Sequence, residues 1–282
     1  MHPSGRSAEP RARTARGTVV LLAALLAGCI NEERERELGD RIAAQVNAQI
    51  PLVRDPALNR YVNDVGGVIA RESGRPDVPY HFYIVNSPAV NAFALPGGHV
   101  YVNRGLIERT ENVSELSAVL AHEIGHIAAR HGAKMLERRL RTGSVVSILY
   151  NLFLGAEPEI LDQRALQMGE AIWTASHSRE AEMEADELAV EYLIGAGVDP
   201  DGMVTLLNGL LEEEKQTARP TLEWFSTHPM TQDRISLARK EIRKEMPDTT
   251  PVLARDIPSY PFFLRRLRRL PPPPMPHPMI MP

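Results

Sequence analysis

One stretch decides the fold of this chain: residues 112–132, NVSELSAVLAHEIGHIAARHG. Asn112 or Ser114 can cap the start of a helix, because a side-chain oxygen there satisfies an unpaired backbone N–H. Apolar residues then recur at spacings of three and four, which is typical of a buried helical stripe: Val113, Leu116, Val119, Leu120, Ile124 and Ile127. Gly132, after the basic Arg130 and His131, predicts the end of the helix.

The same helix carries a pattern that indicates metal chemistry. His122 and His126 are four residues apart, so one helical face presents both imidazoles to a single ion. Glu123 follows directly and can reach a water molecule on that ion. Histidines on a largely apolar helix need a polar partner, and a metal is a good one. The pattern also arises by chance, so its context must decide.

A third ligand is needed, because catalytic zinc sites use three protein ligands and leave the fourth position to water. The pattern H-E-x-x-H-x-x-G-x-x-H is absent, since Ala129 and Gly132 stand at its later positions. A second predicted helix from about residue 178 to 195 offers Glu182 and Asp186 on one face. Glu182 can bind the metal while Asp186 fixes the tautomer of a ligand histidine. Taken singly, each acid is equally compatible with a solvated helix face.

These motifs together resemble a known family. His122-Glu123-x-x-His126 with Glu182-x-x-Ala185-Asp186 is similar to the gluzincin metallopeptidases that include the CAAX prenyl endopeptidases, bacterial quality-control proteases and the mitochondrial protease Oma. Three more stretches agree, in the family's order: residues 91–102 (NAFALPGGHVYV), Gly105-Leu106, and Ser226-Thr227-His228-Pro229 with Arg234. The resemblance spans roughly residues 35 to 245 and favours the bacterial periplasmic lipoprotein branch.

The resemblance implies an α+β fold, mainly helical, with a small sheet or hairpin before the H-E-x-x-H helix. It implies one zinc ion per chain, held by His122, His126 and Glu182, with Glu123 as general base and acid. Asp186 would not bind the zinc itself but would contact one of the histidines that do. His228 would either stabilise the transition state or block the site in a latent form of the enzyme. The structural alternative is that His228-Pro229 forms a turn that caps the next helix. Arg234 would pair with a carboxylate near the site or lie on the surface.

A strand-turn-strand segment before the catalytic helix suits peptide recognition. Alternating apolar residues flank Pro96-Gly97-Gly98, which predicts a turn. An edge strand there can pair with an extended substrate backbone, so Asn91, Phe93 and Ala94 are candidate substrate contacts. An ordinary core hairpin is the alternative. Broad sequence tolerance and unfolded or extended polypeptide substrates follow from main-chain pairing.

The amino terminus predicts a lipid anchor. A basic region precedes an apolar run at residues 18–27, which is too short to span a bilayer comfortably. Leu26-Ala27-Gly28-Cys29 resembles the bacterial lipoprotein signal, and Cys29 is the only cysteine. We expect a signal peptide at 1–28, lipidation of Cys29 and a linker at 29–34. The expected location is the periplasmic face of a bacterial envelope membrane, the outer membrane rather than the inner. The alternative is a plain signal peptide or an uncleaved anchor, with an incidental cysteine.

The composition bounds the rest. Lys+Arg 32 against Asp+Glu 36 provides no basic field for nucleic acid. We expect one catalytic domain over 35–247, and a disordered Arg/Leu- and Pro-rich tail over 248–282. Residues 143–176 can form a lid, core or a membrane-contacting segment. The predicted activity is zinc-dependent endoproteolysis of misfolded envelope proteins. The alternatives are an envelope chaperone with an inactive protease fold and a hydrolase of peptidoglycan or small peptides.

Overall fold

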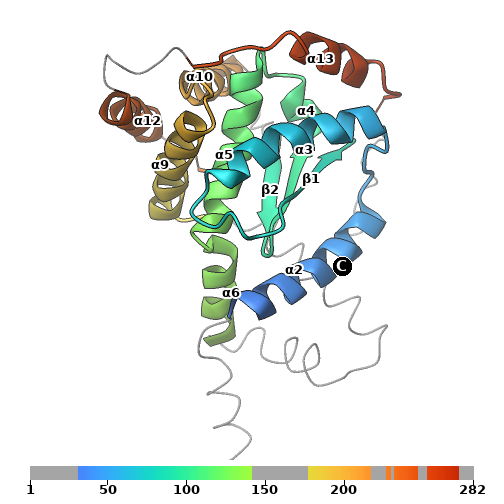
Figure 1. The fold of residues 1–282 in the computed structure, drawn as a ribbon, viewed down its shortest axis with the longest axis vertical. Coiled ribbons are helices and arrows are strands. Elements are labelled where there is room, and N and C mark those ends of the chain that lie inside the picture. Colours follow the sequence, from blue (N-terminus) through green and yellow to red (C-terminus); the bar gives the residue numbers. More distant parts are fainter. Residues whose placement is uncertain (1–30, 142–176, 217–226, 230–231, 247–252, 273–282) are drawn as a thin grey trace, which may run out of the picture.

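The computed structural model describes residues 31–141, 177–216, 227–229, 232–246 and 253–272 (Figure 1). The predictions for Cys29, for residues 143–176 and for the last ten residues fall outside these ranges. The elements in chain order are α2 (Glu32–Gln49), α3 (Pro56–Arg71), β1 (His81–Val85), β2 (Ala92–Leu95), β3 (His99–Asn103), α4 (Arg104–Ile107), α5 (Val113–Ala128), α6 (His131–Arg141), α9 (Arg179–Gly195), α10 (Asp201–Gln216), α12 (Gln232–Glu245) and α13 (Tyr260–Arg268). The α+β class predicted from the sequence is confirmed.

The three strands form one sheet in the order β1-β3-β2. β3 is central; it pairs in parallel with β1 and antiparallel with β2. The turn between β2 and β3 contains Gly97 and Gly98, with φ of 83° and 105°. A Cβ on Gly98 would lie 2.5 Å from the carbonyl oxygen of Pro79, so that position needs glycine for conformation and for space.

The two faces of the sheet are covered by different helices. Phe82, Val100 and Val102 belong to the main core with α3 and α5. Phe93 and Tyr101, which are paired in the register, face the opposite way into a smaller core with α2. Figure 1 shows α3 crossing the strands and α5 running along the long axis of the molecule. The strands and turn expected at residues 92–102 are therefore present, with β3 buried at every position.

Helix α5 lies directly against α9, the second helix expected from the sequence. A Cβ on Gly125 would lie 2.9 Å from the carbonyl oxygen of Ala185, and both Ala185 and Ala189 are fully buried. Small residues therefore allow the two backbones to approach closely. Asn112 caps α5 by accepting from the Glu115 N–H at 3.1 Å, and Ser178 caps α9 in the same way.

Two sequence predictions are corrected. Gly132 does not end the catalytic helix: α5 ends at Ala128, and Gly132 lies inside α6. The helix is interrupted at Arg130, which is the only non-glycine residue with positive φ (59°) in the described part of the chain. The disordered tail expected from residue 248 is wrong for 253–272, where α13 buries Tyr260, Phe263, Leu264 and Leu267 against the main core.

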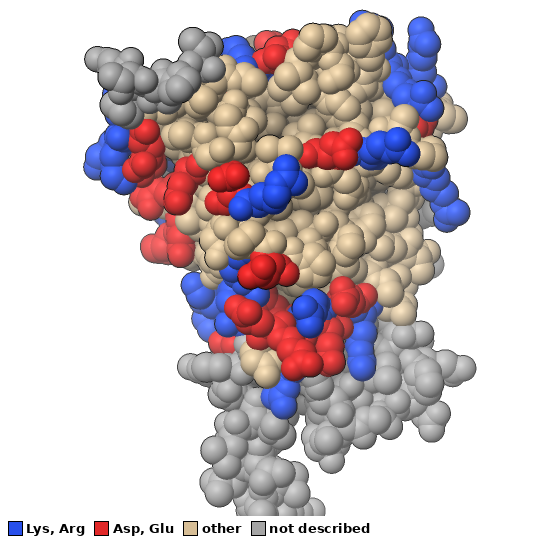
Figure 2. Space-filling view, viewed as in Figure 1, with Lys and Arg blue, Asp and Glu red and all other residues tan. Residues whose placement is uncertain are grey.

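The face drawn in Figure 2 mixes charges of both signs. Its lower part includes α2, whose exposed charged side chains are both acids and arginines, namely Glu32, Glu33, Arg34, Arg36, Glu37, Asp40 and Arg41. Interspersed charges give no extended field of one sign on this face. Among the described residues, no helix has the length and apolar character needed to cross a membrane.

Candidate metal centre

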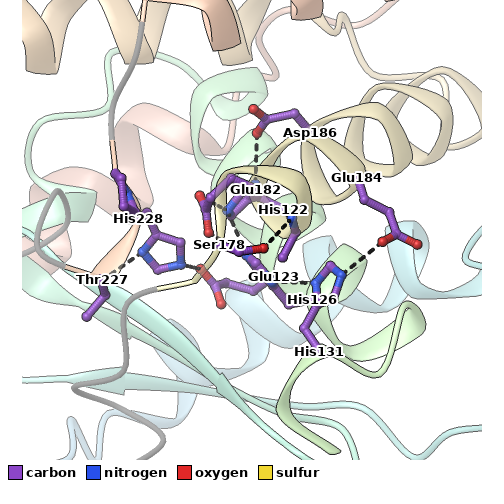
Figure 3. A network of polar contacts seen from close by, with 12 residues as sticks. His122, Glu123, His126, His131, Ser178, Glu182, Glu184, Asp186, Thr227 and His228 are labelled. Carbon is purple, nitrogen blue, oxygen red and sulfur yellow. Dashed lines mark hydrogen bonds and ion pairs between the residues drawn. The ribbon is translucent and has the colours of Figure 1, made fainter. Parts of the chain in front are cut away.

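The centre begins with two buried histidines on α5. His122 and His126 are 2% and 3% exposed, and their Nε2 atoms lie 3.0 Å apart. The four-residue spacing sets both rings on the face of α5 that meets α9. The predicted pair is therefore brought together inside the molecule (Figure 3).

Helix α9 adds Glu182, which is fully buried. Its two carboxylate oxygens lie 3.5 Å from the Nε2 atom of His122 and 3.4 Å from that of His126. His228 joins them, and the four candidate ligand atoms all lie within 4.8 Å of one another. Ligand atoms about 2.0–2.1 Å from a tetrahedral zinc ion are about 3.3 Å apart, so the spacings of 3.0–3.5 Å among His122, His126 and Glu182 fit one such ion.

The outer nitrogen of His122 supports this fit. His122 Nδ1 lies 3.0 Å from Asp186 Oδ1, and a carboxylate can only accept, so Nδ1 carries the hydrogen. The Nε2 atom of His122 lies 3.5 Å from Glu182, and a cation there would take the place of the Nε2 hydrogen. The structure thus places Asp186 where the sequence predicted a supporting residue.

Arg234 of α12 clamps two of these carboxylates. Its Nε and Nη2 atoms donate to Asp186 at 2.7 and 2.8 Å, and its Nη1 atom lies 2.7 Å from a Glu182 oxygen. Burial alone would raise the pKa of Asp186, but the Arg234 guanidinium holds it below its ordinary value. Arg234 is 2% exposed, so of its two predicted positions, site or surface, it takes the one at the site.

Glu123 lies beside the cluster and is 1% exposed. Burial raises the pKa of Glu123 to about 8 in the metal-free chain. A cation next to this carboxylate would favour its charged form and lower that pKa again. A carboxyl group so placed can exchange a proton with a water molecule near neutral pH.

His228 approaches from the segment before α12. Its Nε2 atom lies 3.5 Å from Glu123 Oε1, and its Nδ1 atom lies 2.8 Å from the Thr227 hydroxyl. His177 lies just before α9. Its ring stacks on that of His126 with centroids 4.1 Å apart, and its backbone N–H donates to the Thr227 carbonyl.

In a continuous helix His131, five residues after His126, would point away from the ligand face, but the structure brings it to the cluster. Because the helix breaks at Arg130, His131 Nδ1 comes within 2.8 Å of His126 Nδ1. Glu184 of α9 lies 3.1 Å from His131 Nε2 (Figure 3). Helical periodicity cannot reveal either contact, since it assumes one continuous helix.

The candidate substrate contacts lie at β2. Asn91 is 1% exposed and accepts weakly from the Thr227 hydroxyl at 3.5 Å. Phe93 packs in the smaller core, with its ring stacked on Tyr101, and Ala94 is half-buried. Any substrate contact at Phe93 would therefore use its backbone.

Comparison with known proteins agrees with this site. The family model "Peptidase family M48" matches residues 56–242, which include every residue of the cluster. Two "Beta-barrel assembly-enhancing protease" sequences are similar: that of Yersinia pestis, 33% identical over 223 residues (77% of this chain, 46% of the relative), and that of Escherichia coli K12, 31% over 219 residues (76% and 45%). The "Mitochondrial metalloendopeptidase OMA1" of Schizosaccharomyces pombe is 30% identical over 194 residues (67% and 56%).

The chain spans about half the length of these relatives. The part that matches is the part that builds the buried cluster and the helices around it. M48 peptidases use zinc, and His122, His126, Glu182 and His228 form a cluster that could hold one such ion. On the matched residues and this centre, the chain belongs to peptidase family M48, a family of zinc metalloendopeptidases.

Proposed function

We propose that this chain is a zinc-dependent endopeptidase that cleaves unfolded or extended polypeptides of the bacterial cell envelope. One observation carries the proposal: a buried carboxyl group, Glu123, stands beside three side chains that converge on one point, His122, His126 and Glu182. Burial of a carboxyl group costs free energy. A protein that only binds polypeptides would have no use for Glu123 at that position.

Each residue has a role in peptide hydrolysis. A zinc ion held by His122, His126 and Glu182 would supply Lewis acidity for the scissile carbonyl and for an attacking water. Glu123 accepts a proton from that water and passes it to the amine that leaves. Asp186, which is paired with Arg234, favours the His122 tautomer whose Nε2 atom can bind the metal.

His228 has two available roles, and Thr227 permits both. A hydroxyl can donate or accept. If it donates to His228 Nδ1, then Nε2 carries a hydrogen and can bond the oxyanion of the transition state. If it accepts from Nδ1, then Nε2 is bare and can occupy the fourth ligand position, which gives a latent enzyme.

Substrate would bind along β2. This strand lies at the edge of the sheet and pairs with β3 alone among the described strands. An extended peptide can add to such an edge through main-chain hydrogen bonds, with little demand on its side chains. The backbone near Asn91, Phe93 and Ala94 would make these contacts, and unfolded segments would be preferred.

The proposed location rests on the amino-terminal residues 1–29. We propose that residues 1–28 are removed and that Cys29 is lipidated, so that the anchor lies just before a catalytic domain that begins with α2 at Glu32 and includes α13. The bacterial relatives are named for enhancing β-barrel assembly, which supports an envelope substrate and an outer-membrane location. Replacing Cys29 by serine should abolish incorporation of labelled palmitate and release the protein from the membrane fraction.

The test of activity uses the full-length chain in mild detergent, loaded with zinc, and unfolded casein. We expect cleavage by the natural chain and none by Glu123→Gln, which retains the shape of the side chain but cannot take a proton. His228→Ala separates the two roles of His228: faster cleavage indicates a latent resting state, and slower cleavage indicates oxyanion stabilisation. If zinc binds but no variant cleaves, the envelope-chaperone alternative is favoured.

A further inference from the structure

The helix break after α5 creates a contact that a continuous helix would not allow. Five residues of regular helix turn the chain by about 500°, which would set His131 about 140° from His126. Instead Arg130 adopts φ 59°, α6 restarts at His131, and the two imidazole centroids lie 5.0 Å apart. The left-handed conformation costs a non-glycine residue about 1–2 kcal/mol, so the surrounding structure must hold it.

The Arg130 side chain helps to hold that conformation. Its Nε atom donates to Glu35 Oε2 at 2.7 Å, and Glu35 is 2% exposed. Arg75 donates to the other oxygen of Glu35 and to the Ile127 carbonyl in the last turn of α5. The break is therefore fixed by partners on α2 and just after α3, far away in the sequence.

The hydrogen bonds at His131 determine which nitrogens carry hydrogens. Glu184 lies 3.1 Å from His131 Nε2, and a carboxylate only accepts, so that nitrogen is a donor. The two Nδ1 atoms of His131 and His126 are 2.8 Å apart and cannot both be donors. A neutral His131 therefore accepts at Nδ1, and His126 donates from its own Nδ1.

This assignment leaves the Nε2 atom of His126 without a hydrogen, and that atom faces His122 and Glu182. The two ligand histidines are thus oriented by different means. The Nδ1 atom of His122 lies 3.0 Å from Oδ1 of Asp186, which is 2% exposed. His126 donates to a neutral imidazole, which in turn donates to Glu184, whose side chain is 52% exposed.

We propose that His131 and Glu184 are positioning residues for the metal centre: through the chain Glu184–His131–His126 they fix the tautomer and the ring orientation of His126 for metal binding. This inference rests on the proposed function in so far as it takes His126 to be a zinc ligand. It gives a role to the conformation of Arg130 and to an acid on the outer side of α9.

The test is the zinc dissociation constant of the full-length chain in mild detergent, measured by competition with a chromophoric chelator. Supporting groups around ligand histidines typically contribute about 10–100-fold in metal affinity. We expect His131→Phe, which keeps a ring but cannot accept a hydrogen bond, to weaken zinc binding by about this factor. His131→Gln, whose amide oxygen can accept from His126, should recover part of the loss.

Glu184→Gln is a second variant, and it changes a half-exposed side chain, so it does not alter packing in the core. It should weaken zinc binding, whereas Glu187→Gln, an exposed acid on the same helix, should not. Thermal unfolding of the zinc-free proteins should be equal for these two variants, which a merely structural role of Glu184 would not produce. Nitrogen chemical shifts of the zinc-loaded natural chain should show the hydrogen of His126 on Nδ1.

The outcomes separate the two proposals. If the natural chain binds zinc and both His131→Phe and Glu184→Gln bind it within twofold of the natural value, the positioning role is overturned and the proposed function stands. The same holds if His131→Phe does not fold and Glu184→Gln matches Glu187→Gln. If the natural chain binds no zinc, both proposals fail.

Discussion

Glu35 of α2 and Arg130, the residue at which the catalytic helix breaks, form an ion pair with Oε2 and Nε 2.7 Å apart. The two residues are 95 positions apart in the chain. The carboxylate is 2% exposed and also pairs with Arg75 at 3.2 Å, whereas the Arg130 side chain is 30% exposed. A buried acid between two arginines thus joins α2 to the end of α5 that leads to His131.

Replacing Glu35 by glutamine should destabilise the protein. It leaves two guanidinium groups without their shared charge partner, and we expect a loss of about 2–3 kcal/mol in the free energy of unfolding, below the range for a fully buried pair because both arginines are partly exposed. Denaturant unfolding of the zinc-free protein measures it. Glu32→Gln is the control, since Glu32 is 76% exposed and 3.6 Å from Arg75. Equal effects of the two substitutions would contradict the prediction.

Asp186→Asn should weaken zinc binding by about 10–100-fold, because the amide no longer enforces the tautomer of His122. It should also destabilise the zinc-free protein, since Arg234 loses one of its two buried carboxylate partners. Chelator competition and denaturant unfolding measure the two effects. Asp201→Asn, which changes an exposed acid in the first turn of α10, is the control. Unchanged zinc affinity would show that Asp186 does not orient His122.

The stability that Asp186 contributes should depend on pH in a defined direction. Burial opposes its ionisation, but Arg234 pairs with it and holds the pKa in the folded chain below the ordinary value of 3.8. A group with a depressed folded pKa binds fewer protons when folded, so its contribution is complete above the unfolded pKa and is lost as pH falls through the folded one. The stability difference between the natural chain and Asp186→Asn, both without zinc, should be constant from pH 7 to pH 5 and should shrink below about pH 4. A difference that grows on acidification would contradict this.

Much of the site could be predicted because its information is local. Four-residue spacings place His122 with His126 and Glu182 with Asp186 on single helix faces, and those helices form as expected. The small residues Gly125 and Ala185 also indicate that the two helices meet. The resemblance to a family then supplied His228 and Arg234, which the structure brings to the same cluster.

The helix break, the position of His131 and the packing of α13 depend on contacts between distant residues, which the sequence pattern does not indicate. A glycine is the usual residue for a left-handed helix end, so Gly132 was the natural candidate, and the break at Arg130 depends on the distant Glu35. The role of His131 follows from that break. Similarly, the arginines of α13 suggested a solvated tail, whereas Tyr260 and Phe263 on its other face pack against Tyr61 of α3.

Gly98, in the turn between β2 and β3, and Gly67, inside α3, offer a matched pair of substitutions. Gly98→Ala should destabilise the protein by about 2–3 kcal/mol, because alanine is strained at φ 105° and its Cβ would lie 2.5 Å from the Pro79 carbonyl oxygen. Gly67→Ala, inside α3 with no atom within 4 Å of the added Cβ, should stabilise it by about 0.5–1 kcal/mol. Thermal and denaturant unfolding measure both changes. Two effects of the same sign would contradict the turn geometry.

Two neighbouring phenylalanines in α13 test whether this helix is part of the folded domain. The Phe263 side chain is 5% exposed and its ring stacks on Tyr61 with centroids 4.3 Å apart, whereas Phe262 is 67% exposed beside Arg265. Phe263→Ala should cost about 3–4 kcal/mol, since it leaves a cavity in the main core, and Phe262→Ala should cost less than about 0.5 kcal/mol. Denaturant unfolding of both variants decides the matter. Equal, small losses would mean that residues 253–272 contribute little to the fold, and the catalytic domain would then end before α13, as the sequence suggested.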